Sequence, residues 1–430
     1  MIRILDWETI RPEEILNRDI RAEADVGAAV DAVIADVRKN GDAALLRYTE
    51  RFDGVSLTAL EVTAAEMDAA WAALDEDFKT TLQMAADNIR RFHERQVHND
   101  FVLTDRPGIV MGQRYTPIRR VGVCVPRSPE AFPSTILMNV IPARIAGVEE
   151  IFVVTPPDQT GAVSAEALAA AKIAGADRIF KVGGAQAVAA LAYGTETIPA
   201  VDKVVGPGGI FVATAKRKVF GQVGIDMIAG PSEILVLSDG GSDPAWVAAD
   251  LLSQAEHDVC ASAVLVTDSR PLAQAVQREL EEQLAALPRR DIAAKALNDN
   301  GKIIVTADLS AAVEAVNRIA PEHLELCVAD PFALLPQIRN AGSVFLGRSA
   351  PEALGDYFAG PNHTLPTAGT ARFSSPLGVD DFRKRSSFLY YTREALAEAA
   401  PRIAEFARRE GLEAHARSVL VRFEKEGDRQ

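Results

Sequence analysis

The stretch ADLLSQAEHD, residues 249–258, places an amide and an imidazole three positions apart. In a helix, Gln254 and His257 would project from the same face, with Glu256 and Asp258 next to them. A solvated helix end is the simpler interpretation of these polar residues. The other interpretation is half of a metal site, whose remaining ligands would come from distant parts of the chain.

The chain has only six histidines, so each of them can be considered. His93 and His98 lie in the polar segment FHERQVHND and are expected to be solvated. The other four have carboxyl or amide side chains nearby in sequence: His257, His323, His363 and His415. A carboxylate beside an imidazole suits general acid–base catalysis, and ligands without thiolate suit a catalytic rather than a structural zinc. Taken singly, however, each histidine fits a hydrogen-bonded structural role better.

Three strand ends run directly into turn residues and then a helix: VPRSPEAFPST, VGGAQ and VGPGG. Backbone N–H groups at such helix starts can bind a phosphate, and open α/β sheets bind ligands at the carboxyl ends of their strands. None of the three is a G-x-G-x-x-G fingerprint. A dinucleotide is therefore permitted, while tight turns that need glycine explain each stretch equally well.

The elements that would position these residues follow a simple order. Residues 21–98 have the periodicity of amphipathic helices, and from about residue 119 short apolar strands alternate with helices in two successive series. After residue 350 the chain is rich in loops and ends in charged helices. This order predicts an α/β protein with two Rossmann-like, doubly wound parallel-sheet domains, a helical N-terminal region and an extended helical C-terminal tail.

At 430 residues the chain is too long for one simple core. We expect residues 1–20 to form an N-terminal arm and residues 21–120 with 234–375 to form a discontinuous first α/β domain. Residues 121–233 would form the second α/β domain, on the cofactor side. Residues 376–430 would be a C-terminal tail that packs on another domain or subunit, because they contain too little apolar surface to be stable alone.

Composition excludes several classes of function. There are 46 basic and 60 acidic residues, and the net charge of -14 disfavours binding to nucleic acid or to an anionic membrane. Cys124, Cys260 and Cys327 are scattered without zinc-knuckle, redox or disulfide spacing. The charged N-terminal segment has no signal-like apolar region, and the uncharged runs are too short to span a bilayer. We therefore expect a soluble protein of the reducing cytoplasm.

Longer motifs resemble one enzyme family in order and spacing: GGAQAVAALAYGTETIPAVDKVVGPG, AKRKVFGQVGIDMIAGPSE, DLLSQAEHD, IAPEHLEL, GDYFAGPNHTLPT, ARFSS and EGLEAHA. The chain resembles histidinol dehydrogenases from about residue 25 to residue 420. The resemblance implies an enzyme that uses zinc and NAD to oxidise L-histidinol through L-histidinaldehyde to L-histidine, the last step of histidine biosynthesis.

The resemblance also assigns residues. It implies that zinc is bound by Gln254, His257, Asp356 and His415, with His415 contributed by the tail of the partner in a homodimer whose tails are exchanged. It makes His323 the base for the hydroxyl proton and Glu322 the residue that activates water. The substrate would contact the zinc ligands and His323 together with three further residues: Ser232, His363 and Glu410.

The cofactor positions depart from the family pattern. Cys124 stands where the family has a tyrosine along NAD, and Gly209 replaces an asparagine that contacts the cofactor. Arg127 and Ser128 replace a glycine pair, so that Gln186 alone keeps the family's residue type. NAD would then bind in a shifted pose, with Arg127 meeting its pyrophosphate. Neutral drift at weak contacts would explain the same substitutions.

Other functions stay open at this point. A relative of the family could oxidise another amino alcohol or a polyol, such as a sulfopropanediol. A zinc hydrolase would use the same ligands without NAD, and a non-catalytic metal-binding protein would not need the adjacent Glu322 and His323. The histidinol-like motifs GPNHTLPT and EGLEAH favour histidinol as the substrate.

Overall fold

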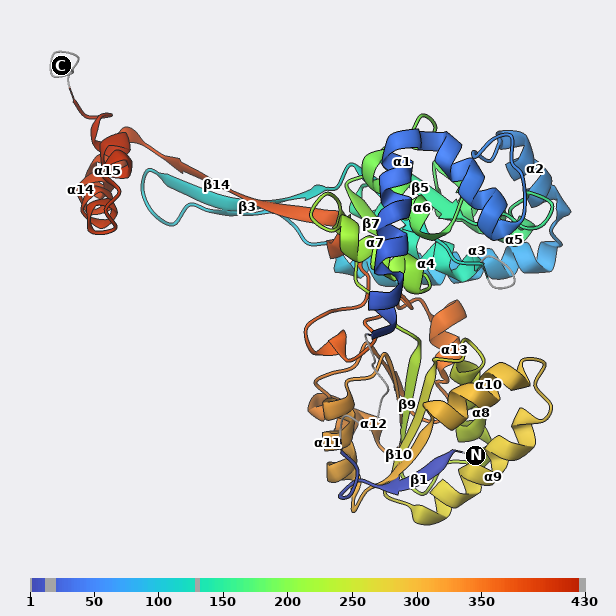
Figure 1. The fold of residues 1–430 in the computed structure, drawn as a ribbon. Coiled ribbons are helices and arrows are strands. Elements are labelled where there is room, and N and C mark those ends of the chain that lie inside the picture. Colours follow the sequence, from blue (N-terminus) through green and yellow to red (C-terminus); the bar gives the residue numbers. More distant parts are fainter. Residues whose placement is uncertain (1, 12–20, 128–131, 425–430) are drawn as a thin grey trace. The chain divides into compact units, whose positions relative to one another are not determined.

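The computed structural model describes residues 2–11, 21–127 and 132–424. Ser128 and half of the expected N-terminal arm lie outside these residues. The chain divides into two compact units, one of residues 1–97 and 118–382 and the other of residues 98–117 and 383–430. Two parallel sheets in the first unit, each with helices on both faces, give the predicted α/β class (Figure 1).

The first parallel sheet has the strand order β6-β5-β4-β7-β8. Its strands are β4 (Arg120–Cys124), β5 (Glu150–Thr155), β6 (Arg178–Lys181), β7 (Lys203–Val205) and β8 (Gly224–Ile225). The strand order reverses at β4, because β5 and β6 lie on one side of it and β7 and β8 on the other. The gap between the carboxyl ends of β4 and β7 is therefore the topological switch point, where doubly wound sheets bind ligands.

Seven helices cover this sheet: α1 (Arg21–Asp53), α2 (Ala64–Ala73), α3 (Glu76–His93), α4 (Pro133–Ala146), α5 (Ala165–Ala174), α6 (Gly184–Tyr193) and α7 (Ile210–Val219). The apolar stripe of α1 packs with α6 and α7, while α2 and α3 pack on α5 and α4. This packing differs from the division expected from the sequence, which grouped residues 21–120 with residues 234–375. Helical periodicity identifies an apolar face but not the sheet that it covers.

The second parallel sheet has the order β1-β11-β10-β9-β12-β13. Its strands are β1 (Arg3–Asp6), β9 (Glu233–Ser238), β10 (Ser262–Thr267), β11 (Lys302–Val305), β12 (His323–Cys327) and β13 (Ser343–Leu346). One face packs on α8 (Pro244–Ala255), α9 (Arg270–Leu284) and α10 (Arg290–Asp299), and the other on α11 (Leu309–Ile319) and the segment of α12 (Pro331–Leu334) and η3 (Leu335–Gln337). The described start of the expected arm is thus an edge strand of this sheet.

A loop-rich segment follows β13 and contains α13 (Glu352–Leu354), η4 (Gly355–Ala359), η5 (Thr370–Arg372) and η6 (Val379–Phe382). It is anchored to α4, because the Asn362 side chain donates to Met138 O (2.6 Å) and Asn139 donates to Thr364 Oγ1 (3.1 Å). Asn88 of α3 donates to Phe358 O (2.9 Å). The segment is therefore held by helices of the first sheet.

The second unit joins β14 (Arg383–Tyr391) to β3 (Ile109–Pro117) and β2 (Phe101–Leu103) in an antiparallel sheet, with α14 (Arg393–Arg409) and α15 (Glu413–Leu420) (Figure 1). The short helix η2 (Glu94–Gln96) precedes β2 in the chain. The sequence predicted helices here but not this ribbon, because β14 is exposed along most of its length and lacks an apolar alternation. Among the described helices, none has the length and hydropathy of a membrane span.

A buried lysine yields a stability prediction. Lys302, at the start of β11, donates to Asn300 O (3.0 Å), and burial lowers the pKa of its ammonium group from 10.5 to about 8. Below pH 8 the folded protein therefore bears the cost of a buried charge, and this cost disappears as the pH rises towards 10.5. Lys302→Met should stabilise the protein at pH 7 by on the order of 2 kcal/mol.

The measurement is the melting temperature between pH 7 and pH 10, where the advantage of Lys302→Met should shrink as the pH rises. The matched control is Lys295→Met, since Lys295 is an exposed lysine bonded to Asp299 (2.6 Å) and should give no such gain. A pH-independent difference between Lys302→Met and the unmodified protein would contradict the assignment.

Candidate active site

The candidate catalytic pair, Glu322 and His323, lies at the amino end of β12, next to the amino end of the neighbouring strand β9. His323 is the first residue of β12 and pairs with Ile234 of β9, so that Glu322 and His323 lie beside Ser232 and Glu233. The turn that leads into β12 is tight, because Ala320 closes α11 with a φ of +54°. The strand register therefore brings two separate stretches of the sequence together, IAPEHLEL and AGPSE.

The hydrogen bonds of His323 define its tautomer. Its Nδ1 lies 3.0 Å from Glu233 O, and a carbonyl oxygen can only accept, so Nδ1 carries the proton. The opposite nitrogen, Nε2, is buried and makes no hydrogen bond. It faces Asp356 Oδ1 at 3.6 Å and Glu352 Oε1 at 3.9 Å. With Nδ1 bonded to Glu233 O, Nε2 is the nitrogen that can exchange a proton, and it acts as a general base when the ring is neutral.

Glu322 is fixed by the same pair of strands. Its Oε2 accepts a hydrogen bond from Glu233 N (2.8 Å), and burial raises the pKa of its carboxyl group to about 7. A carboxyl group with a pKa near neutrality can take up and release protons under physiological conditions. Glu233, which the sequence analysis did not select, holds both neighbours through its own backbone.

Glu352 is the second residue that the sequence analysis missed. It is buried in α13, four positions before Asp356, and its Oε2 accepts from Ser253 Oγ (3.2 Å). Its Oε1 faces His323 and makes no hydrogen bond. The spacing EALGD, which places two carboxylates on one helical face, was the available signal.

Gln254 and His257 occupy the end of α8, as the opening motif suggested, but the helix ends at Ala255. Gln254 lies in the last turn and is buried, and its Oε1 makes no hydrogen bond. His257 lies in the following turn. Its side chain is exposed, yet desolvation by the neighbouring protein lowers the pKa of its imidazole, and the charge of Asp356 opposes this shift.

His363 also points into this region. Its Nδ1 donates to Asp356 O (3.0 Å), which leaves the buried Nε2 without a hydrogen bond. Gln254, His323 and His363 therefore each have a buried polar atom without a hydrogen-bond partner. Such atoms are unfavourable in a finished core, and a ligand or metal ion would satisfy them.

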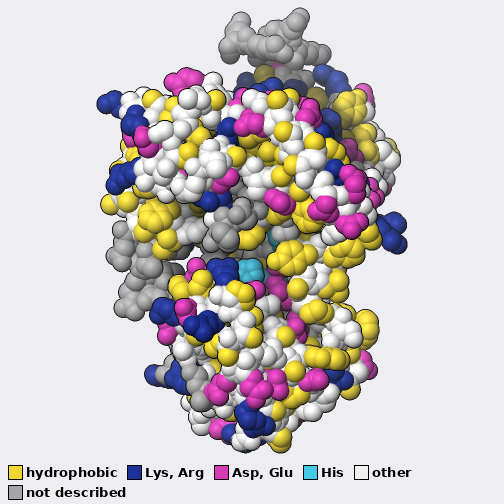
Figure 2. Space-filling model, turned by 90° about the vertical axis from the view of Figure 1, so that its right-hand side faces the viewer, with side chains coloured by type: hydrophobic (Ala, Val, Ile, Leu, Met, Phe, Trp, Pro, Cys, Tyr) yellow, Lys and Arg dark blue, Asp and Glu magenta, His cyan; other side chains and the backbone are white. Residues whose placement is uncertain are grey.

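The charges of the cluster fit a metal ion. Although burial alone would lower the pKa of the His323 imidazole, the carboxylates of Glu322 and Asp356 raise it to about 10. Surroundings that stabilise an imidazolium also stabilise a metal cation. His323, Glu352 and Asp356 place three possible ligand atoms within 4.8 Å of one another. Figure 2 shows one histidine side chain on this face of the molecule, between basic and acidic side chains.

Two of the expected site residues belong to the other unit. Glu410 is the C-cap residue of α14 and His415 lies in α15, and both are exposed. His415 N donates to Leu412 O (3.1 Å), and no described side chain hydrogen-bonds to its ring. Exposure leaves both side chains open to contacts outside their own unit.

The cofactor candidates lie at carboxyl ends of the first sheet. Cys124 ends β4, Gln186 lies in the first turn of α6 after β6, and Gly209 caps the N-terminus of α7 after β7. Cys124 and Gly209 thus follow the two strands that flank the switch point. Burial raises the pKa of the Cys124 thiol to about 12, so this residue is a small apolar group rather than a nucleophile.

One expectation about the remaining histidines was wrong. His93 is fully buried at the end of α3, where its Nδ1 lies 2.8 Å from Gln96 Oε1. It lies on the same helix as the buried residues Leu82, Ala86 and Ile89. His98 is exposed, as expected, and stacks on Tyr115.

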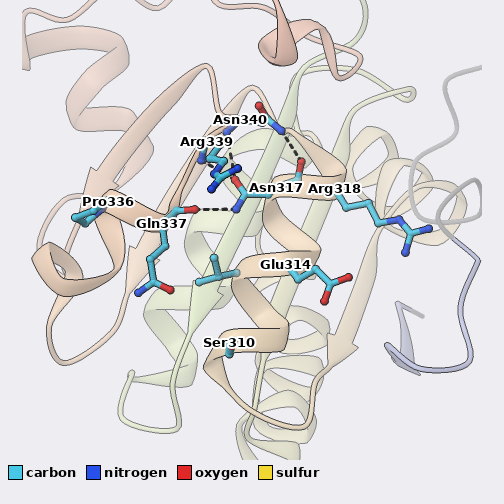
Figure 3. A pocket seen from close by; sticks show the side chains of 9 residues that line it. Ser310, Glu314, Asn317, Arg318, Pro336, Gln337, Arg339 and Asn340 are labelled. Atoms are coloured by element: carbon cyan, nitrogen blue, oxygen red, sulfur yellow. Dashed lines mark hydrogen bonds between the residues drawn. The ribbon is translucent and has the colours of Figure 1, made fainter.

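A separate groove lies between α11 and the segment that follows β12 (Figure 3). Its central polar residue, Asn317, donates to Gln337 O (2.8 Å) and accepts from Arg339 N (2.6 Å). These bonds tie a loop to the helix. The groove thus has a structural explanation and is distinct from the cluster around His323.

Comparison with known proteins agrees with this geometry. The family model described as histidinol dehydrogenase matches residues 16–423. The histidinol dehydrogenase of Geobacillus kaustophilus (strain HTA426) is 56% identical over 420 residues, which cover 97% of this chain and 99% of the relative. That of Halalkalibacterium halodurans is 53% identical over 419 residues, with coverage of 97% and 99%.

A solved structure is also similar. The crystal structure of histidinol dehydrogenase from Elizabethkingia anophelis superposes with a TM-score of 0.89 and is 38% identical, covering 93% of this chain and 92% of that chain. Sequence and fold thus agree over nearly the whole chain. The chain belongs to the histidinol dehydrogenase family.

Proposed function

We propose that the protein oxidises L-histidinol to L-histidine in two steps, with two NAD+ as hydride acceptors. The observation that carries this proposal is the buried His323 imidazole, whose protonated Nδ1 is held by Glu233 O and whose free Nε2 faces Asp356. The family catalyses the last step of histidine biosynthesis as NAD-dependent, zinc-binding enzymes. A free imidazole lone pair beside a candidate metal site is what the oxidation of an alcohol requires.

Gln254, His257 and Asp356 would hold the zinc, together with His415 from the partner subunit. When bound there, the metal would supply a Lewis acid that orients the substrate in the site. The unpartnered Gln254 Oε1 supports this set, as does the position of Asp356 beside His323. Glu352, next to Asp356 in the cluster, adds negative charge that favours the cation.

The two catalytic residues would divide the proton transfers. His323 Nε2 takes the hydroxyl proton as each hydride leaves the substrate carbon for NAD+. Glu322 accepts a proton from the water that hydrates the aldehyde between the two oxidations. A pKa near 7 suits Glu322 to this task, and Ser232, His363 and Glu410 would contact the substrate.

NAD+ would bind at the switch point of the first sheet, with Cys124, Gln186 and Gly209 around it. The turn of residues 206–209 leads to the N-terminus of α7 there, and its backbone N–H groups suit the pyrophosphate. Arg127 would add a charged contact in a shifted pose. An enzyme that oxidises another amino alcohol or a polyol is the second candidate, favoured only by the substitutions at Cys124 and Gly209.

We further propose a cytoplasmic homodimer with exchanged tails. The second unit exposes apolar side chains that include Leu389, at 74% of its surface, and Phe406, at 67%. Such exposure is unfavourable in a free monomer and suits a protein interface. Cys124, Cys260 and Cys327 are all free, which fits a reducing compartment.

The first test is the stoichiometry of the reaction. Zinc-loaded protein with excess NAD+ should form about two NADH per L-histidinol consumed, with L-histidine as the product, because two hydrides leave one carbon. No NADH from histidinol, together with NADH from an amino alcohol or polyol, would support the second candidate. Turnover of an ester or amide without NAD+ would indicate a hydrolase.

The second test concerns the base. His323→Asn keeps a donor near Glu233 O but removes the free lone pair of Nε2, so kcat should fall by roughly 10²–10⁴-fold. Zinc content, melting temperature and the Kd for NAD+ should stay close to those of the unmodified protein. Unchanged turnover would exclude His323 as the base.

The third test concerns the altered cofactor position. A Cβ added at Gly209 meets no atom within 4 Å, and its φ of -63° accepts any residue. Gly209→Asn should therefore fold normally and lower the KM for NAD+ several-fold, because the amide can reach the cofactor. Gly209→Ala is the matched control and should leave the KM unchanged. Equal KM values for all three proteins would indicate neutral drift at this position.

A further inference from the structure

Lys216 of α7 and Asp226, which follows β8, form a salt bridge that is almost completely buried. Their side chains are 3% and 1% exposed. Neither residue has a role in the reaction described above. A buried ion pair is costly, and an apolar pair of similar volume often stabilises a protein as well or better. The presence of this pair therefore calls for a reason other than stability.

Both side chains hydrogen-bond to the backbone of one residue, Gly206. Asp226 Oδ2 accepts from Gly206 N (2.8 Å), and Lys216 Nζ donates to Gly206 O (2.9 Å). Gly206 is the first residue after β7, and it begins the turn GPGG that leads to the N-terminus of α7. Both polar groups of its peptide backbone are thus tied to one ion pair.

Gly206 also has little freedom to move. Its φ is +98°, and an added Cβ would lie 2.2 Å from Cys124 O at the end of β4. The turn therefore passes directly against the neighbouring strand at the switch point. A small shift of Gly206 would move Gly208, Gly209 and the first N–H groups of α7, which are the donors available to a phosphate.

We propose that the Lys216–Asp226 ion pair is a positioning element for the dinucleotide, which fixes the turn of residues 206–209 in the shape that receives the cofactor's pyrophosphate. The inference rests on the proposed function. Lys216 does not itself serve as the phosphate ligand, because Asp226 neutralises its charge and both side chains are buried. Its effect on the cofactor passes through the backbone of Gly206.

The test compares kinetic constants in the zinc-loaded holoenzyme. Lys216→Met should raise the KM for NAD+ by about tenfold or more, because Gly206 O loses its donor and Asp226 loses its counterion. The KM for L-histidinol and the zinc content should stay within twofold of the unmodified protein, since the cluster around His323 is built by other elements. A structural role alone would not separate the two KM values.

The control is Lys203→Met. Lys203 is the first residue of β7, at the end of the strand opposite to Gly206. Its side chain is largely buried and donates to Asp381 O (2.6 Å). It should show no selective change in the KM for NAD+. An equal effect of both substitutions on this KM would overturn the proposal.

A double variant, Lys216→Met with Asp226→Asn, protects the test against misfolding, because it leaves no buried charge unpaired. If the double variant folds but binds NAD+ as the unmodified protein does, the pair is not a positioning element. If it does not fold, the pair is required for stability, and the proposal is overturned as well. An unmodified enzyme without NAD+-dependent turnover would contradict the proposed function itself, separately from this inference.

Discussion

Burying carboxylates away from water is unfavourable unless a positive charge or hydrogen-bond donors accompany them. The first unit buries Glu322, Glu352 and Asp356 around one imidazole, and this constraint explains much of the site. Glu322 receives a backbone donor from Glu233, while Asp356 and Glu352 face His323. The cluster has more carboxylates than positive charges, and this excess negative charge suits it to a divalent cation.

The same constraint gives the strand register a chemical role. Because β9 and β12 are neighbours, the backbone of Glu233 can donate to Glu322 and accept from His323 at once. A displacement of one strand by one residue would exchange the faces of its side chains and separate these groups. The tautomer of the candidate base therefore depends on sheet formation and not on a side-chain partner alone.

The sequence predicted the class of fold because its strands are covered on both faces and are continuous apolar runs. A metal site of Gln254, His257, Asp356 and His415, with His323 as the base, was predicted only through long motifs that resemble a family. Local periodicity did not reveal which sheet α1 covers, and the exposed ribbon of β14 had no apolar alternation to detect. Contacts made by backbone groups, such as those of Glu233 and Gly206, leave no pattern in the side-chain sequence.

The proposed cofactor turns and the proposed catalytic cluster are built by different sheets. The cluster is built from the amino ends of β9 and β12, from α8 and from the segment after β13, whereas Cys124 and Gly209 follow β4 and β7 of the other sheet. A substitution in these turns can change the pose of a dinucleotide without moving His323 or its carboxylates. Residues in the turns of the first sheet can therefore be substituted more freely than those around His323. The proposed proton transfers depend on the hydrogen bonds and charges of the second sheet and not on these turns.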